Sequence, residues 1–235
     1  MSEPTLADNL ASVLGRASAA AERAGRLPRS WRLVAVTKTV SPGLAAALAD
    51  LGAADLGENR VQDLLAKRDA LAGRAVRWHL IGHLQTNKVR KVVGAVDLIH
   101  SVDSLRLAGE IEKAAAAIGF LQEVLLEVNV SGETSKFGLA LADAASVAAG
   151  VAELPHVRLV GLMTMAPIVD DPEKTRPLFG RLRRLAGEVA ARGLFARSPY
   201  ELSMGMTQDF EVAIEEGATL IRVGSALFEG IQGGA

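Results

Sequence analysis

Short apolar runs alternate with longer amphipathic or alanine-rich segments along most of the chain. The first run, Leu33-Val34-Ala35-Val36, is aliphatic throughout, which is typical of a parallel strand buried on both faces. Eight such runs predict strands at 33–37, 54–57, 77–81, 97–101, 123–129, 158–163, 200–204 and 219–223. The remaining segments predict helices at 5–24, 42–51, 60–71, 86–94, 104–118, 140–153, 172–193 and 207–216.

The order of these elements predicts the fold. Strands that alternate with helices imply a parallel sheet with right-handed crossovers, and eight units are what a closed (β/α)8 barrel of the TIM type needs. We therefore predict an α/β fold with one barrel domain over 1–235, in which residues 1–30 form an N-terminal helical extension. Because no glycine-, serine- or proline-rich linker divides the chain, a second domain is not expected. An open, doubly wound sheet is the alternative, since sequence does not reveal closure.

Composition narrows the class of protein. The chain is 49% hydrophobic and 23% charged, and its net charge of −1 argues against binding to nucleic acid. It has no cysteine, which excludes disulfides, thiol catalysis and thiolate metal sites. We see neither a signal peptide nor an apolar stretch of about 18 residues, so we expect a cytoplasmic protein without a membrane partner.

Lys38 is the first candidate functional residue, because it directly follows the first strand. Barrels of this type keep their chemistry at the carboxyl ends of the strands. The chain has 7 lysines against 19 arginines, so a lysine here suggests an amine that loses its proton and attacks a carbonyl. The alternative is a lysine that extends from a strand end into water.

The last two strand ends have the features of an anion site. The run Ser203-Met204-Gly205-Met206-Thr207 leads into the helix predicted from residue 207, which Thr207 is suited to cap. The run Arg222-Val223-Gly224-Ser225 ends the eighth strand, and loops after strands seven and eight often bind phosphate in barrels. Hydroxyls and free backbone amides at both ends predict a phosphate cradle. For either loop alone, turn glycines and a helix cap are a sufficient explanation.

Two further groups leave alternatives open. Arg222 lies in an apolar strand, so it either serves a function or points outward to a carboxylate such as Glu215 or Glu216. His79 and His83 lie on either side of a strand end, and we favour structural roles for them. Without a third ligand at clear spacing, we predict no metal site.

Five motifs together resemble the pyridoxal phosphate homeostasis proteins, also described as the YggS/PROSC-like family, whose barrel is of the alanine racemase type. The motifs are VTKTV at 36–40, GENRVQ at 57–62, WHLIGHLQTNK at 78–88, LSMGMTQDF at 202–210 and RVGSALF at 222–228. The resemblance extends from about residue 33 to residue 230.

The resemblance implies pyridoxal 5′-phosphate (PLP) as the cofactor. Lys38 matches the lysine that forms a Schiff base with the cofactor aldehyde, Asn59 an asparagine near the ring, and Arg222 the arginine that faces the pyridine nitrogen. Lys136 falls where related racemases carry an arginine near the ring oxygen. The phosphate-binding positions match Ser203, Gly205, Thr207, Gly224 and Ser225.

The same residues suggest a carrier rather than an enzyme. An arginine only donates hydrogen bonds, so the ring nitrogen stays unprotonated and the ring is a weak electron sink. Racemases with this barrel take a second base, a tyrosine, from a β-rich domain for which we expect no room in 235 residues. The chain's single tyrosine, Tyr200, is predicted at the start of the seventh strand, away from the site.

We therefore predict a monomeric protein that holds PLP as a Schiff base on Lys38. It would buffer the cofactor and deliver it to apo PLP-dependent enzymes, with little or no turnover of its own. One alternative is a small PLP-dependent amino-acid racemase whose second base comes from His83 or from a partner. Others are a cofactor-free Schiff-base aldolase and a barrel with only a scaffold role.

Overall fold

The computed structural model describes residues 5–28, 30–133 and 137–231. Lys136, a sequence-predicted neighbour of the cofactor ring, lies outside the described residues. Within the described ranges the strands are β1 Arg32–Val36, β2 Asp55–Glu58, β3 Arg77–Leu80, β4 Leu98–Val102, β5 Gln122–Asn129, β6 Leu139–Ala140, β7 Val157–Met163, β8 Glu201–Ser203 and β9 Leu220–Val223.

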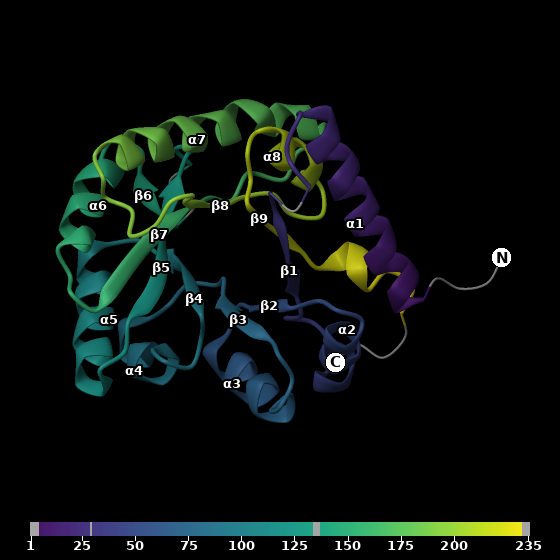
Figure 1. The fold of residues 1–235 in the computed structure, drawn as a ribbon, viewed down its shortest axis with the longest axis horizontal. Helices are drawn as coiled ribbons and strands as arrows, with labels where there is room; N and C mark the ends of the chain where they lie inside the picture. Colours follow the sequence, from purple (N-terminus) through teal and green to yellow (C-terminus); the bar gives the residue numbers. More distant parts are fainter. Residues whose placement is uncertain (1–4, 29, 134–136, 232–235) are drawn as a thin grey trace.

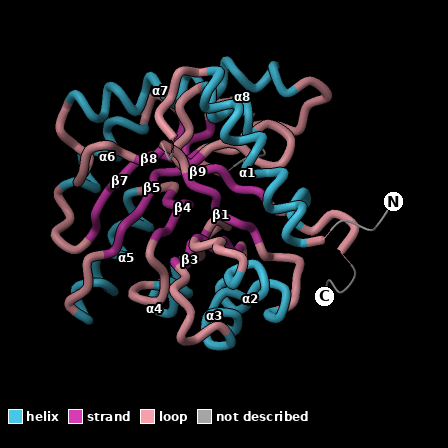
Figure 2. The backbone as a smooth tube through the Cα atoms, turned by 45° about the vertical axis from the view of Figure 1, so that its right-hand side comes forward, coloured by secondary structure: helices cyan, strands magenta, loops and turns pink. Residues whose placement is uncertain are grey.

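Eight of these strands form a closed parallel barrel. They pair in the order β4-β3-β2-β1-β9-β8-β7-β5, and a further pairing between β4 and β5 closes the ring (Figures 1 and 2). Closure confirms the predicted (β/α)8 barrel and excludes the open sheet. The short strand β6 was not predicted; it pairs with β5 at the edge of the ring and occupies the start of a segment expected to be helical.

Helices surround the barrel (Figure 1). They are α1 Leu6–Arg23, α2 Pro42–Asp50, α3 Val61–Ala70, α4 Val89–Val92, α5 Leu105–Ile118, α6 Ala144–Ala152, α7 Arg176–Ala191 and α8 Phe210–Glu215. The N-terminal helix α1 starts with a capping box, in which Thr5 and Asp8 bond each other's backbone amides at 3.0 and 3.2 Å. It packs beside α8 on the outside of the barrel (Figure 1). No helix in the described part of the chain is long and apolar enough to cross a membrane.

Alternation along the strands divides the apolar residues into two clusters. The larger cluster lies between the strands and the helices. The smaller one fills part of the barrel interior and consists of Val34, Val36, Ile81, Leu98, Leu125, Val160, Met163 and Leu220. Buried polar side chains share that interior, including His79, His100 and Arg222. Since a charged or polar side chain is costly to bury without a partner, each of these residues needs hydrogen-bond partners inside the barrel.

Candidate functional site

The loops after β8 and β9 bring two hydroxyl groups together at the carboxyl end of the barrel. The Ser225 hydroxyl donates to Thr207 Oγ1 at 3.1 Å, although the two residues are 18 positions apart in the chain. Ser225 is exposed and Thr207 half-buried. The two loops therefore present paired hydroxyls to solvent at the mouth where an anion site was predicted.

The loop after β8 depends on glycine at one position. Gly205 has a φ of +91°, and a Cβ there would lie 2.5 Å from the Ala213 Cβ and 2.9 Å from the Phe210 Cα. A side chain is thus excluded both by backbone conformation and by the close packing of α8. The Gly205 carbonyl accepts a hydrogen bond from the Arg222 amide at 2.9 Å, which ties this loop to β9.

The expected helix start at residue 207 is wrong. The helix α8 begins at Phe210, and Asp209 turns the chain before it by accepting a hydrogen bond from the Met206 amide at 2.6 Å. Thr207 therefore caps no helix, and its side chain faces Ser225 instead. A carboxylate that bonds a backbone amide three residues upstream forms a local turn, which the apolar spacing of 207–216 does not reveal.

The loop after β9 comes close to the end of β1. A Cβ on Gly224 would lie 3.2 Å from the Val36 carbonyl oxygen and 3.3 Å from the Val36 Cβ. The next residue, Ser225, starts a short 3₁₀ turn, Ser225–Leu227. This close approach brings the hydroxyl pair to the strand end that Lys38 follows.

Lys38 is exposed just beyond β1, and buried side chains hold the residue that precedes it. The Thr37 hydroxyl donates to Glu58 Oε1 at 2.6 Å, and Lys67 Nζ donates to the Thr37 carbonyl. Lys67 and Glu58 form an ion pair of 2.6 Å, with side chains only 7% and 0% exposed. A buried charge pair of this kind fixes the backbone on which Lys38 stands.

Asn59 follows β2 on the same mouth and is half-buried. Its backbone packs against Gly82, where a Cβ would lie only 2.3 Å from the Asn59 carbonyl oxygen. Glycine at position 82 therefore allows the loops after β2 and β3 to come into backbone contact.

Arg222 points into the barrel. It is 4% exposed, and its guanidinium donates to the Ser203 hydroxyl at 2.6 Å and to the Thr164 carbonyl at 2.9 Å. Burial lowers the pKa of Arg222 to about 10, partly offset by the charges of Asp209 and Glu127, so the side chain stays protonated at neutral pH.

The outward alternative for Arg222 is thereby excluded. The carboxylates proposed as its partners bond other arginines: Glu215 pairs with Arg23 and Arg176, and Glu216 with Arg176 and Arg183.

Ser203 is not brought together with the exposed hydroxyls of Thr207 and Ser225. It is fully buried, and its Oγ contacts Arg222 and His100 Nδ1, the latter at 2.9 Å. Of the predicted phosphate residues, Thr207, Gly224 and Ser225 thus lie at the mouth, whereas Gly205 and Ser203 are buried.

Glu127 is a buried acid in the barrel that sequence analysis missed. It lies on β5, is 3% exposed, and burial raises its pKa to about 7, opposed by Arg222 and reinforced by Asp103. The sequence did contain an indication of this acid. Glu127 interrupts the apolar run Leu125-Leu126-Glu127-Val128 at a position whose side chain, by the alternation along a strand, points into the barrel.

His79 and His83 do not share a site. His79 is buried between Asp55 and His100, whereas His83 stacks on Phe137 with ring centroids 4.5 Å apart and lies 3.5 Å from Asp103. Among the described residues, no group of three or more His, Cys, Asp and Glu side chains could hold a metal ion.

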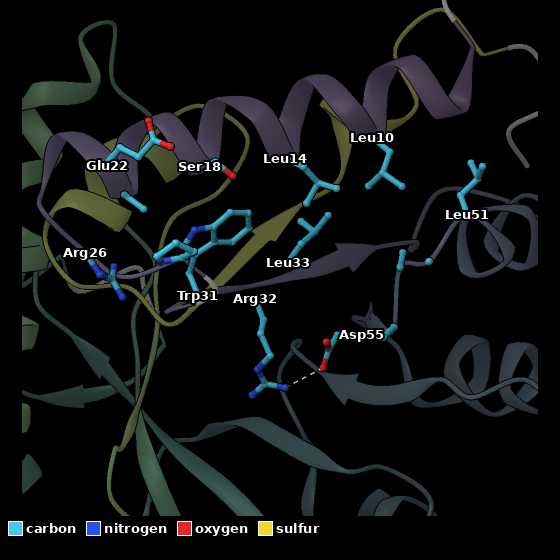
Figure 3. Close-up of a pocket in the computed structure, with 15 residues that line it drawn as sticks. Leu10, Leu14, Ser18, Glu22, Arg26, Trp31, Arg32, Leu33, Leu51 and Asp55 are labelled. Carbon is cyan, nitrogen blue, oxygen red and sulfur yellow. Dashed lines mark hydrogen bonds and ion pairs between the residues drawn. The ribbon is translucent and has the colours of Figure 1, made fainter.

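Two clefts lie on the opposite side, at the amino ends of the strands. One of about 440 Å³ lies between α1 and the start of β1 and is lined by Leu14, Trp31 and Leu51 (Figure 3). The other, about 550 Å³, opens over Arg77, Asp97 and Glu201. Arg32 borders both clefts and pairs with Asp55 at 3.0 Å (Figure 3). Lys38, Thr207 and Ser225 line neither cleft.

The closed parallel barrel with its N-terminal helix is the architecture expected of an alanine racemase-type barrel. The family model "Alanine racemase, N-terminal domain" matches residues 10–231. The curated pyridoxal phosphate homeostasis protein of Aquifex aeolicus is 45% identical over 221 residues, which are 94% of this chain and 96% of that protein. The chain therefore belongs to the pyridoxal phosphate homeostasis proteins, within the alanine racemase N-terminal domain family.

Solved structures give the same result. PipY of Synechococcus elongatus PCC7942, solved with PLP bound, superposes with a TM-score of 0.84 at 35% identity over 95% of this chain and 100% of PipY. An alanine racemase of Clostridium difficile superposes with a TM-score of 0.76 at 17% identity. It shares the fold alone, and the match covers 94% of this chain but 56% of the racemase.

Proposed function

We propose that this protein binds PLP at the carboxyl mouth of the barrel and holds it as a Schiff base on Lys38. The proposal extends to a role as an intracellular reservoir, which buffers PLP and delivers it to apo-enzymes as a single chain. Support comes from PipY, which was solved with PLP, and from relatives named for PLP homeostasis.

One observation carries the proposal: the hydroxyl pair of Thr207 and Ser225, the amine of Lys38 and the buried Arg222 belong to one end of the barrel. These groups fit a phosphorylated aldehyde with a basic ring. The hydroxyls and the amides of the glycine loops suit the phosphate. The Lys38 amine suits the aldehyde carbon, where a C=N bond forms and water leaves.

Arg222 favours storage over turnover. Its guanidinium stays protonated at neutral pH and only donates hydrogen bonds, so a ring nitrogen facing it accepts and remains unprotonated. PLP supplies an electron sink when bound, but an unprotonated ring is a weak one. This disfavours most carbanion chemistry.

The position of the single tyrosine favours storage as well. Tyr200 precedes β8 at the amino end of the barrel and packs on Phe195 with ring centroids 4.9 Å apart. Lys38 follows the carboxyl end of β1. The tyrosine therefore lies at the wrong end of the barrel to act as a second base opposite Lys38.

The test is the absorption spectrum of the purified protein after addition of PLP, with and without borohydride. We expect a yellow Schiff-base band in the wild type, which borohydride fixes on the Lys38 peptide, and its complete loss in Lys38→Ala. Lys174→Ala removes an exposed lysine paired with Asp170 and should retain the band. A band that persists in Lys38→Ala would assign the Schiff base to another lysine and overturn the proposal.

Two further assays separate storage from catalysis. Loaded protein mixed with an apo PLP-dependent enzyme should restore its activity while a phosphatase destroys free PLP. L-Alanine incubated with loaded protein should keep its optical rotation. Steady racemisation that disappears in Lys38→Ala would replace the storage function by that of a small racemase.

A further inference from the structure

A continuous chain of hydrogen bonds crosses the barrel interior from its amino end to Arg222. Asp55 Oδ1 lies 2.9 Å from His79 Nε2, and His79 Nδ1 lies 2.8 Å from His100 Nε2. His100 Nδ1 lies 2.9 Å from Ser203 Oγ, which accepts from Arg222 Nη1 at 2.6 Å. None of the five residues is more than 4% exposed. Little of their surface is therefore open to solvent.

The chemistry of the end groups fixes the direction of the chain. Arginine only donates, so Ser203 Oγ accepts from Arg222, and its single proton goes to His100 Nδ1. His100 then carries its proton on Nε2 and donates to His79 Nδ1. His79 in turn carries its proton on Nε2 and donates to the Asp55 carboxylate. Both histidines are neutral, and every bond points from Arg222 toward Asp55.

If the hydrogen bonds ran in the opposite direction, Ser203 and Asp55 would lack partners. If His79 donated from Nδ1 and His100 also donated from Nδ1, the Ser203 hydroxyl proton would have no acceptor in the chain. Asp55 would also face a bare nitrogen unless His79 carried two protons. Burial lowers the pKa of His100 well below its ordinary value, and the positive charge of Arg222 lowers it further, which agrees with a neutral ring.

Two arginines hold the Asp55 carboxylate in place at the end of this chain of hydrogen bonds. Arg77 binds both of its carboxylate oxygens, at 2.7 and 2.6 Å, and Arg32 adds a contact of 3.0 Å. Burial opposes ionisation, but hydrogen bonds from His79 and Arg77 outweigh it and hold the pKa of Asp55 below its ordinary value. The carboxylate therefore stays charged and keeps accepting from His79.

We propose that Asp55, His79, His100 and Ser203 are positioning residues for Arg222. They hold one guanidinium nitrogen against Ser203 while the Thr164 carbonyl holds the other, so the orientation of Arg222 toward the cofactor ring is set from the far end of the barrel. The inference rests on the proposed PLP function. It gives Ser203 a role through Arg222 instead of direct contact with the phosphate.

The first experiment measures the tautomers in the protein without cofactor. The protein has four histidines in all, so side-chain ¹⁵N spectra of histidine-labelled protein are simple to assign. We expect His79 and His100 each to carry a single proton, on Nε2, from pH 8 to pH 9. A proton on Nδ1 of either ring, or a doubly protonated ring in this range, would contradict the direction of the chain and overturn the inference.

The second experiment compares Ser203→Ala with Ser101→Ala. Both serines are fully buried, but the Ser101 hydroxyl donates to the Gly82 carbonyl at 2.7 Å, outside the chain. In the protein without cofactor, Ser203→Ala should move the nitrogen signals of His100 and His79, and Ser101→Ala should not. In loaded protein, Ser203→Ala should shift the absorption band and speed PLP release about tenfold, the effect of losing one hydrogen bond to a charged group.

Asp55→Asn tests the chain from its far end. It should shift the band in the same direction as Ser203→Ala, although it lies at the amino end of the barrel. If PLP binds all variants with wild-type spectra and release rates, the positioning role is refuted and the proposed function stands. If wild-type protein takes up no PLP, the proposed function fails and the inference fails with it.

Discussion

Lys67→Met is expected to destabilise the protein without cofactor by about 3–5 kcal/mol, because it leaves Glu58 charged and buried without its cation. Glu58 is 0% exposed, and among the described residues its Oε2 has no hydrogen-bond partner. After the substitution only the Thr37 hydroxyl still donates to the carboxylate. The expected fall in Tm is roughly 6–20 °C for a chain of this size. Urea and thermal unfolding measure the effect.

Lys113→Met is the matched control. Lys113 forms an ion pair with Glu110 of almost the same length, 2.7 Å, but its side chain is 74% exposed. Because solvent screens such a pair, the same substitution should cost less than about 1 kcal/mol. Equal losses at the two positions would show that burial of the Lys67–Glu58 pair carries no special cost.

The double variant Glu58→Gln/Lys67→Met separates the charge from the packing. It removes both charges and should regain part of the stability lost in Lys67→Met. In Lys67→Met the Thr37 carbonyl also loses its donor, so the loop that carries Lys38 loses a contact. Schiff-base formation should therefore be slower in Lys67→Met even when the protein is folded.

Most of the barrel was predictable because its strands are buried on both faces. Such strands are short uninterrupted apolar runs, and the predicted 33–37 corresponds to β1 at Arg32–Val36. The same holds for β7, predicted at 158–163 and observed at Val157–Met163. Errors arose where polar contacts decide the backbone, as at Asp209, whose bond to the Met206 amide delays the start of α8.

The candidate site was predictable only in part. Lys38, Thr207 and Ser225 follow strand ends, and strand order alone brings such residues to one mouth. Their roles toward PLP remain predictions. The chain of hydrogen bonds from Asp55 to Arg222 was not visible in the sequence, because its histidines and Ser203 belong to separate strands. His100 and Ser203 are 103 positions apart. The sequence places His79 and His100 in predicted strands, but it does not show which side chains they contact.

Substitution of Glu127 is the second change expected to have a large effect on the free energy of unfolding. Its pKa is raised to about 7 in the folded protein by burial, against 4.5 for an ordinary glutamate. Below pH 4.5 the group is protonated in both states, and its contribution to stability is fully present. As pH rises toward 7, the unfolded chain ionises first, so the wild type loses stability, by about 3 kcal/mol in total.

Glu127→Gln cannot ionise and should escape this loss. Relative to wild type, the variant should gain stability steadily from pH 4.5 to about pH 7 and keep a gain of about 3 kcal/mol above it. Urea unfolding of the protein without cofactor at pH 5, 6, 7 and 8 measures the difference. Glu123→Gln on the same strand removes a carboxylate that pairs with Arg197 at 3.3 Å, and it should bring no such gain.

The pH profile also has a consequence for the site. Arg222 and Asp103 are the charged groups that act on Glu127, so its ionisation places a negative charge beside the arginine proposed to face the cofactor ring. In loaded protein, the absorption band of the wild type should change between pH 6 and pH 8, and that of Glu127→Gln should not. A stability difference that stays constant from pH 5 to pH 8 would mean that Glu127 is already ionised in the fold at pH 5, and that Arg222 compensates for its burial.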